Sequence, residues 1–495
     1  MRTLIQSARR LTHSLLASAC VLTCMGAQAA TITVTSRDPA GVGFNDTTPA
    51  APVGGNPGTT VGQQRLNVYR FVADVWEKAL ESNTTINVSA AWEALTCTAN
   101  SAVLGSAGAW NIWHDFQGGK PGTWYPQALA NKLYGSNLSA NVADDGSGYG
   151  NVDIKTQFNV NLGNADCLAG SSFYLGLDGN AGAKVNFVET LLHELGHGLG
   201  FSVLSVQTSS GNRLNASGSA YVASGGLPSV WENFMFDNTA NKSWLDMTNT
   251  ERKASAINPL KLAWTGANAV DSATFLSKVP VIATSSPVPG GSGTYTYFAA
   301  AFGPAITTPS ALGTLANIND VAGAEGCTAF SSTNAAAVAG KVAIITRGGC
   351  GFVAKVKNAQ TAGAVGVILA NSDSAITTPG GADPTITIPS ALVSKADGLA
   401  LKAAVTAAVP YGSRRSAGVV GASWSVDPSR IAGADTQGRP LLYTPATLAA
   451  GSSVSHWDVS ATPNLLMEPN INSDLGLILV APKDLTVPLL KDLGW

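Results

Sequence analysis

The segment LLHELGHGLGF, residues 191–201, constrains the fold of this chain more than any other stretch. On a helix, residues four apart lie on the same face, so His193 and His197 can direct their rings at one metal ion. Glu194 is turned about 100° from His193, close enough to act on a water at that ion without being a ligand. The chain must therefore form a helix here and bring another ligand to it.

The residues around this segment predict where the helix begins and ends. Asn186, followed three residues later by Glu189, resembles a capping box, and the leucines between residues 191 and 199 supply an apolar face. Gly200 can take the positive φ of a sharp turn at the other end. We therefore expect the chain to turn back beneath the metal after Gly200.

The N-terminus has the order of a secretory signal peptide, with charged, apolar and then small residues. MRTLIQSARR is followed by LLASACVLTCMGA and by AQAA at residues 27–30. The apolar run is shorter than the roughly 20 residues that span a bilayer. We expect residues 1–29 to be removed and the protein to be secreted, with the periplasm, the cell surface or a lipoprotein at Cys24 as less favoured alternatives.

The composition excludes some partners. The chain has 495 residues, of which 12% are charged, and a net charge of −2. This length allows more than one domain, and the charge provides no electrostatic footprint for nucleic acid. No segment after the signal peptide predicts a membrane span, and the oligomeric state is left open.

The segment order predicts an α/β fold in the first half of the chain. Residues 31–38, 85–95 and 152–160 read as strands, and residues 63–82 read as a long amphipathic helix. The helix with the two histidines follows them. Strand, helix, strand, strand and helix is an α/β arrangement.

The composition changes near Lys278. Residues 279–410 are rich in Ala, Val, Gly and Thr, and residues 340–372 read as a buried strand, a glycine turn, an amphipathic helix and a second buried strand. This stretch resembles the protease-associated domain, which implies a small α/β module that is not itself catalytic. The resemblance is carried by Arg347, Gly348, Cys350, Phe352, Lys355, Asn358, Ala359, Ala362, Gly363, Ala364 and Gly366.

Four cysteines remain after the signal peptide. In an oxidising compartment they most simply form two disulfides, although three pairings are possible. The division of the chain near Lys278 favours Cys97 with Cys167 and Cys327 with Cys350. Neither pair has the close spacing of a thiolate zinc site.

The third ligand is not next to the helix. The metzincin pattern, His-Glu-x-x-His-x-x-Gly-x-x-His, is matched through Gly200, but its last position is Val203, which cannot bind zinc. The segment GSSVSHWDVSATPNLLMEP, residues 451–469, resembles the leishmanolysin branch of the metzincins. That resemblance implies His456 as the third zinc ligand and Met467 as the methionine of the turn under the metal.

The sequence also allows other choices for the third zinc ligand. Glu232 lies downstream on a possible helix, as the third ligand does in gluzincin peptidases, and Asp246 is a weaker candidate. His456 could be an ordinary surface histidine. His114 has no partner motif and is expected to be structural.

These patterns together predict a secreted zinc endopeptidase that acts on proteins or peptides. A metzincin-like zinc protease domain, residues 30–278 and 411–495, would be interrupted by the protease-associated module at 279–410. Three imidazoles on Zn²⁺ would leave room for a water, and Glu194 would act as its general base. The alternatives are a gluzincin-type peptidase and a non-catalytic, zinc-stabilised exported binding protein.

Overall fold

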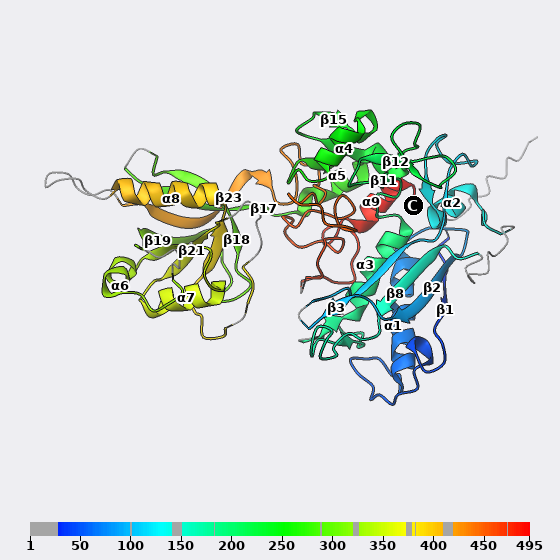
Figure 1. Cartoon of the computed structure of the whole chain (residues 1–495), viewed down its shortest axis with the longest axis horizontal. Coiled ribbons are helices and arrows are strands. Elements are labelled where there is room, and N and C mark those ends of the chain that lie inside the picture. Colours follow the sequence, from blue (N-terminus) through cyan, green and yellow to red (C-terminus); the bar gives the residue numbers. More distant parts are fainter. Residues whose placement is uncertain are drawn as a thin grey trace, which may run out of the picture.

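The computed structural model describes residues 28–495 except 100, 141–150, 183, 288–289, 320–325, 373–378, 382, 409–418 and 473. The expected signal peptide, apart from its last two residues, therefore lies outside the described residues. The described chain is a mixed α/β protein that forms two bodies, a larger one and a barrel (Figure 1). None of its described helices has the length and apolarity needed to cross a membrane.

A four-stranded sheet forms the base of the larger body. Its strands, in spatial order, are β1 (Ile32–Ser36), β2 (Ile86–Glu93), β8 (Ile154–Asn159) and β5 (Gly105–Ala109). The first three strands are parallel, whereas β5 runs antiparallel to β8. Since β5 pairs with β8 alone among the described strands, its other side is an edge of the sheet.

Two long helices pack together on this sheet, α1 (Val61–Ala79) and α3 (Phe187–Leu199). The helix expected over residues 63–82 thus begins two residues earlier, where the side chain of Thr60 caps it. Tyr69 on α1 is fully buried and its ring meets the rings of Phe158 and Phe187 at centroid distances of 6.1 and 6.0 Å. These aromatic contacts fix α3 against the sheet.

Shorter elements make up the rest of the larger body (Figure 1). Before α3 they are η1 (Gly43–Asn45), β3 (Cys97–Thr98), β4 (Ser101–Ala102), β6 (Ile112–Trp113), β7 (Tyr125–Pro126), α2 (Gln127–Tyr134), β9 (Phe173–Tyr174) and β10 (Val185–Asn186). After α3 they are β11 (Val206–Gln207), β12 (Asn212–Leu214), β13 (Tyr221–Val222), η2 (Val230–Phe234), β14 (Met235–Asp237), β15 (Lys242–Ser243), η3 (Trp244–Asp246), α4 (Asn249–Ser255), β16 (Leu262–Trp264), α5 (Ala267–Ser272) and η4 (Ala273–Phe275). The C-terminal helix is α9 (Thr486–Leu493).

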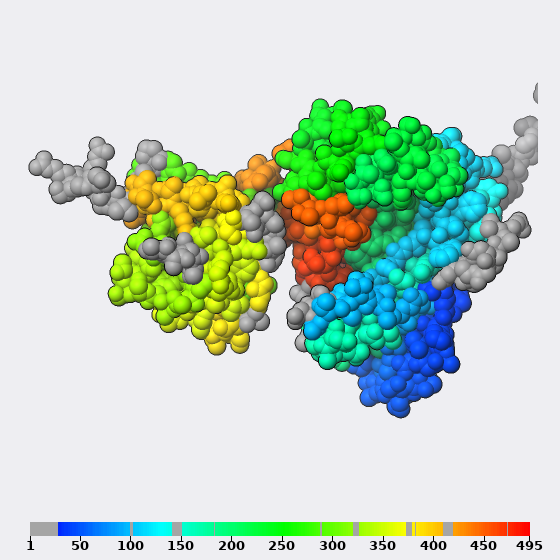
Figure 2. Space-filling model, viewed as in Figure 1, coloured from blue at the N-terminus to red at the C-terminus, as the bar shows by residue number. Residues whose placement is uncertain are grey.

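The second body, here called the barrel module, is a closed seven-stranded barrel in the order β17-β18-β22-β21-β20-β19-β23. Its strands are β17 (Lys278–Ser285), β18 (Gly293–Ala299), β19 (Ser310–Asn317), β20 (Val342–Thr346), β21 (Gly366–Ala370), β22 (Ser390–Val393) and β23 (Gly421–Ile431), and its helices are α6 (Ser332–Val338), α7 (Phe352–Thr361) and α8 (Lys395–Ala408). The strand, helix and strand expected in residues 340–372 are β20, α7 and β21. Figure 2 shows the barrel module as a mass set apart from the larger body.

The barrel module extends beyond the boundary expected from the sequence. Position 410 lies outside the described residues, but β23 follows it and pairs with both β17 and β19. An end at residue 410 would leave the barrel open, so that boundary was wrong by one strand. The composition of residues 279–410 did not reveal β23 because this strand lies beyond them, is more polar and has Trp424 as its one buried residue.

The core of the larger body is built from both sides of the barrel module in the sequence. One hydrophobic cluster contains Trp76 and Leu191 from the first part together with Trp457 and Leu490 from the last part. The buried residues of the barrel module form separate clusters. The barrel module is therefore an insertion into one folding unit.

Both disulfides form within one body each, in the pairing favoured by the sequence. Cys97 and Cys167 join at an S–S distance of 2.10 Å in the larger body, and Cys327 and Cys350 join at 2.06 Å in the barrel module. Cys97 lies in β3, while Cys350 lies just before α7. Each disulfide closes a loop within its own body and none crosses between the two.

Candidate metal centre

The helix α3 carries the first two histidines as the sequence predicted. The side chain of Asn186 caps it by accepting from the backbone N–H groups of Val188 and Glu189. The helix extends to Leu199, so its last two turns place His193 and His197 on one face.

Gly200 then reverses the chain. Its φ of 120° is one that residues with a Cβ rarely adopt, and a Cβ there would meet Pro126 at 2.9 Å. The reversal brings the carbonyl of Phe201 to within 2.7 Å of Nδ1 of His197. The turn expected at Gly200 therefore also supplies the hydrogen-bond acceptor for His197.

The third histidine comes from a loop far along the chain. His456 is 5% exposed and follows Val454, whose φ of 71° is an uncommon conformation for a β-branched residue. The loop directs the carbonyl of Ser452 at Nδ1 of His456, at 2.9 Å. Val203, the position where a nearer third histidine would stand, donates its N–H to the hydroxyl of Ser455. The loop thus lies directly beside the turn that follows α3.

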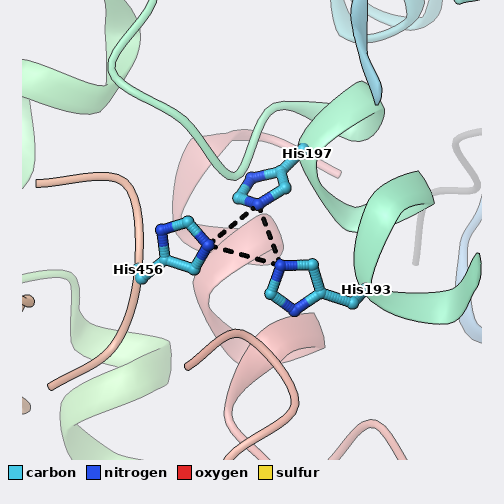
Figure 3. A group of neighbouring side chains, drawn as sticks. All are labelled: His193, His197 and His456. Atoms are coloured by element: carbon cyan, nitrogen blue, oxygen red, sulfur yellow. Dashed lines mark hydrogen bonds between the residues drawn. The ribbon is translucent and has the colours of Figure 1, made fainter. Parts of the chain in front are cut away.

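The three rings meet at their Nε2 atoms (Figure 3). The Nε2 of His197 lies 3.1 Å from that of His193 and 3.1 Å from that of His456, and the third separation is 3.3 Å. Three nitrogens that each lie about 2.0–2.1 Å from one tetrahedral zinc ion would be about 3.3 Å apart. The spacing therefore fits a single small cation. In the described part of the chain, no other group of three His, Cys, Asp or Glu side chains converges in this way.

The hydrogen bonds of the rings define their tautomers. In each ring Nδ1 faces a backbone carbonyl, from Leu466, Phe201 or Ser452, at 2.7–2.9 Å. A carbonyl can only accept, so Nδ1 must carry the proton in all three rings. A neutral ring then has a bare lone pair at Nε2, and three such lone pairs face one another.

Burial keeps the rings neutral. It lowers the pKa of His193 to about 4 and that of His456 to about 3, and it also lowers the pKa of His197, with the neighbouring histidines acting in the same direction. Converging neutral imidazoles repel one another unless a cation sits between them. The donor set therefore fits zinc, which histidine nitrogen binds well.

Glu194 lies between this centre and the edge strand. Burial raises its pKa to about 7, and a hydrogen bond from the backbone of Ala107 in β5 opposes that rise. A carboxylate with a pKa near neutral is suited to accept and then return a proton. The residue as a whole is partly exposed.

Met467 packs beneath α3 at Gly196, the residue directly before His197. Its side chain is fully buried, and its Sδ lies 2.7 Å from the place where a Cβ on Gly196 would stand. Gly196 therefore provides the space that Met467 fills. Gly196 was not predicted to matter here, although a glycine in the middle of a helix is itself a signal of close packing.

The other residues considered as ligands, Glu232 and Asp246, lie outside the group of three histidines. The carboxylate of Glu232 is buried and accepts from the guanidinium of Arg213 at 2.8 Å and from the hydroxyl of Ser205 at 2.8 Å. Asp246 is exposed on η3 and outside the histidine group. His114 bonds Asp115 and the carbonyl of Ala216. The structure thus brings together His193, His197 and His456 and gives the rival candidates other partners.

Comparison with known proteins identifies one part of the chain. The family model described as the PA domain matches residues 311–401. These residues carry a PA domain. They lie inside the barrel module and run from β19 to α8, so β17, β18 and β23 of the same barrel lie outside the match. The PA domain match does not include any of the three histidines.

The other comparisons say little about the larger body. A search of the curated proteins found no match. Similar solved structures include a zinc aminopeptidase from Bacillus subtilis (21% identity, 32% of this chain and 35% of that chain, TM-score 0.19) and an aminopeptidase from Aneurinibacillus sp. strain AM-1 (19%, 40% and 41%, 0.20). A peptidase M28 precursor from Shewanella amazonensis is similar at 18% identity over 36% of this chain and 42% of that chain, with a TM-score of 0.18. This chain thus matches less than half of each of these proteins. With TM-scores this low, the likenesses carry no argument about its activity.

Proposed function

We propose that this protein is an exported zinc endopeptidase of the metzincin type. The observation that carries the proposal is the convergence of three neutral imidazoles, each with its proton on Nδ1 and its Nε2 lone pair directed at one point. A purely structural polar cluster would place donors against acceptors. The two disulfides support an oxidising compartment and hence export.

In this proposal His193, His197 and His456 hold the metal. Zinc bound by three histidines supplies Lewis-acid activation of water and of a peptide carbonyl. The carbonyls of Leu466, Phe201 and Ser452 hold the rings in the tautomer that binding requires.

Glu194 is the general base of the proposed reaction. It follows His193 directly on α3 but points to a different side of the helix, toward β5. Its carboxylate can take a proton from the attacking water and pass it to the leaving amine of the peptide. A site that only stabilised the fold would not need this partly buried carboxylate beside its ligands, which argues against the non-catalytic binding protein.

The edge strand β5 offers a place for an extended substrate. Its residues are small, GSAGA, and the side of β5 away from β8 pairs with no described strand. An extended peptide can add to such an edge through backbone hydrogen bonds. Ala107 in the middle of β5 bonds Glu194, so a peptide along this edge would pass the proposed base. This arrangement favours cleavage within a chain over removal of a terminal residue.

The gluzincin alternative has less support. It needs the carboxylate of Glu232 at the metal, but both oxygens of that group are bonded, to Ser229 and Ser205 on one side and to Arg213 on the other. Moving this carboxylate to a metal would take away the ion-pair partner of Arg213. Glu232 is fully buried, so breaking the pair would be costly.

The test is to measure zinc content and peptide cleavage of the purified mature protein. We expect one zinc per chain and cleavage of casein and of a peptide blocked at both ends, lost with a chelator and restored by zinc. Zinc binding without cleavage would support the binding protein instead. Cleavage restricted to peptides with a free N-terminus would identify an aminopeptidase and contradict endopeptidase action.

The barrel module should be removable without loss of the metal. Its ends are adjacent, since Lys278 pairs with Ile431 and Ala432 donates its N–H to the carbonyl of Ser277 at 2.8 Å. Replacing residues 279–430 with an Asn-Gly turn, a good two-residue hairpin connection, should keep zinc and short-peptide hydrolysis while changing the rate on large proteins. Zinc content and the two rates measure this.

A second deletion is the matched control for that experiment. Removing only residues 279–410 keeps β23 but strips it of its barrel partners and exposes Trp424, which is 2% exposed in the whole chain. We expect this protein to aggregate. If the complete deletion folds and holds zinc but no longer cleaves short peptides, the barrel module helps to form the active site.

A further inference from the structure

The turn that carries Met467 is bonded to two of the three histidine segments. The carbonyl of Leu466 accepts the Nδ1–H of His193 at 2.8 Å. The carbonyl of Met467 accepts the N–H of Trp457, the residue after His456, at 2.8 Å. The position of this turn therefore sets the position of a ring on α3 relative to a ring on the C-terminal loop.

A buried carboxylate holds the turn from the opposite side. Asp484 is 4% exposed, and its Oδ2 accepts the backbone N–H of Leu466 at 2.7 Å. Its Oδ1 accepts the N–H of Thr486, the first residue of α9, at 2.6 Å. Leu466 thus donates to Asp484 with its N–H and accepts from His193 with its carbonyl.

We infer that Asp484 is a positioning residue for the metal centre. It fixes Leu466 against the start of α9, and Leu466 in turn fixes the ring of His193 and the proton on its Nδ1. This inference rests on the proposed function, because the ring direction matters only if His193 binds a metal. Groups that hold the second nitrogen of a ligand histidine affect metal affinity through its orientation.

An ordinary role for Asp484 would be to cap α9, and its two oxygens allow the roles to be separated. A helix cap needs only one acceptor, which serine also provides. Asp484→Ser therefore keeps an oxygen for the N–H of Thr486 but leaves the N–H of Leu466 without an acceptor. If capping is the whole role, this variant should bind zinc as the wild type does.

Asp492, which lies on α9 itself, provides a control for Asp484. Its carboxylate accepts from Nε1 of Trp264 at 2.9 Å and from the N–H of Asn268 at 2.8 Å, so it also ties α9 to the rest of the larger body. Within the described residues its carboxylate bonds Trp264, Asn268 and Ala269, and none of these belongs to the turn or to a histidine-bearing segment. Asp492→Asn weakens the anchoring of α9 but leaves the hydrogen bonds that connect Asp484, Leu466 and His193 unchanged.

The experiment measures the zinc dissociation constant of the full mature protein by competition with a chelator. We expect Asp484→Ser to raise it about 10–100-fold and Asp492→Asn to leave it nearly unchanged. Thermal unfolding of both variants without metal shows whether their folds are equally affected. If Asp484→Ser does not fold, Asp484→Asn, which keeps the size and one acceptor oxygen, takes its place.

A second measurement reports the bond itself. In protein labelled with ¹⁵N-histidine, the Nδ1–H resonance of His193 should shift or exchange faster in the Asp484 variant and stay in place in Asp492→Asn. Equal zinc affinity in wild type and Asp484 variant, or equal losses in both variants, would overturn the role of Asp484. A wild-type protein that binds no zinc would instead overturn the proposed function, and this inference with it.

Discussion

Glu194→Gln is expected to keep the zinc and the fold but to lower peptide hydrolysis by a factor of about 10²–10⁴ or more. The carboxamide has nearly the same size and can still accept from the backbone of Ala107, so α3 and β5 should stay in place. It cannot take a proton from water, however, and the proposed reaction needs that step. Cleavage of casein and of a blocked peptide, measured alongside zinc content, checks both halves of the prediction.

Glu189→Gln is the matched control for Glu194→Gln. Glu189 lies in the first turn of the same helix, one turn before His193, and is also partly buried, but it is not part of the group that the three histidines form. The same chemical change there should leave the rate close to that of the wild type. A Glu194→Gln enzyme that still cleaves at the wild-type rate would exclude Glu194 as the general base.

His456→Ala is expected to abolish tight zinc binding, and with it all peptide hydrolysis. The variant leaves only the two nitrogens of α3, whereas zinc sites of this kind use three protein ligands. Elemental analysis after dialysis against a weak chelator measures the loss. Activity should not return with added zinc at concentrations that restore the wild type.

Two further substitutions make the His456→Ala result specific. His114→Ala removes a histidine that bonds Asp115 and Ala216, so it should retain zinc. Glu232→Gln changes the carboxylate that the gluzincin alternative requires and should also retain zinc. A full zinc content in His456→Ala together with an empty Glu232→Gln would reverse the ligand assignment.

Local elements of this chain could be predicted because nearby residues determine them. The helix α3 begins at a side-chain cap on Asn186 and ends at Gly200, whose φ is positive as expected. The strand β1 followed from alternation, β2 and β8 followed from strand-like segments between polar loops, and the disulfide pairing followed from dividing the chain into two parts. In each case the information lies within a few residues or in composition.

The extent of the barrel module could not be predicted in this way. The strand β17 ends at Ser285 and pairs with β23, which begins at Gly421, 136 residues later. The polar pattern of β23 gives no sign that it belongs with the apolar strands before it. Only closure of the barrel decides that, because an unpaired edge would leave its backbone groups without partners.

By itself, the sequence determined the types of residue at the proposed centre: two histidines and a glutamate on one helix, a third histidine chosen by resemblance, and a methionine after it. The tertiary structure decided that His456 meets His193 and His197, and it supplied the carbonyls that set their tautomers. Those carbonyls are backbone groups that every residue has, so no sequence pattern marks them. Their direction depends on how turns at Gly200, Val454 and Leu466 pack against one another, and that is settled only when the whole core forms.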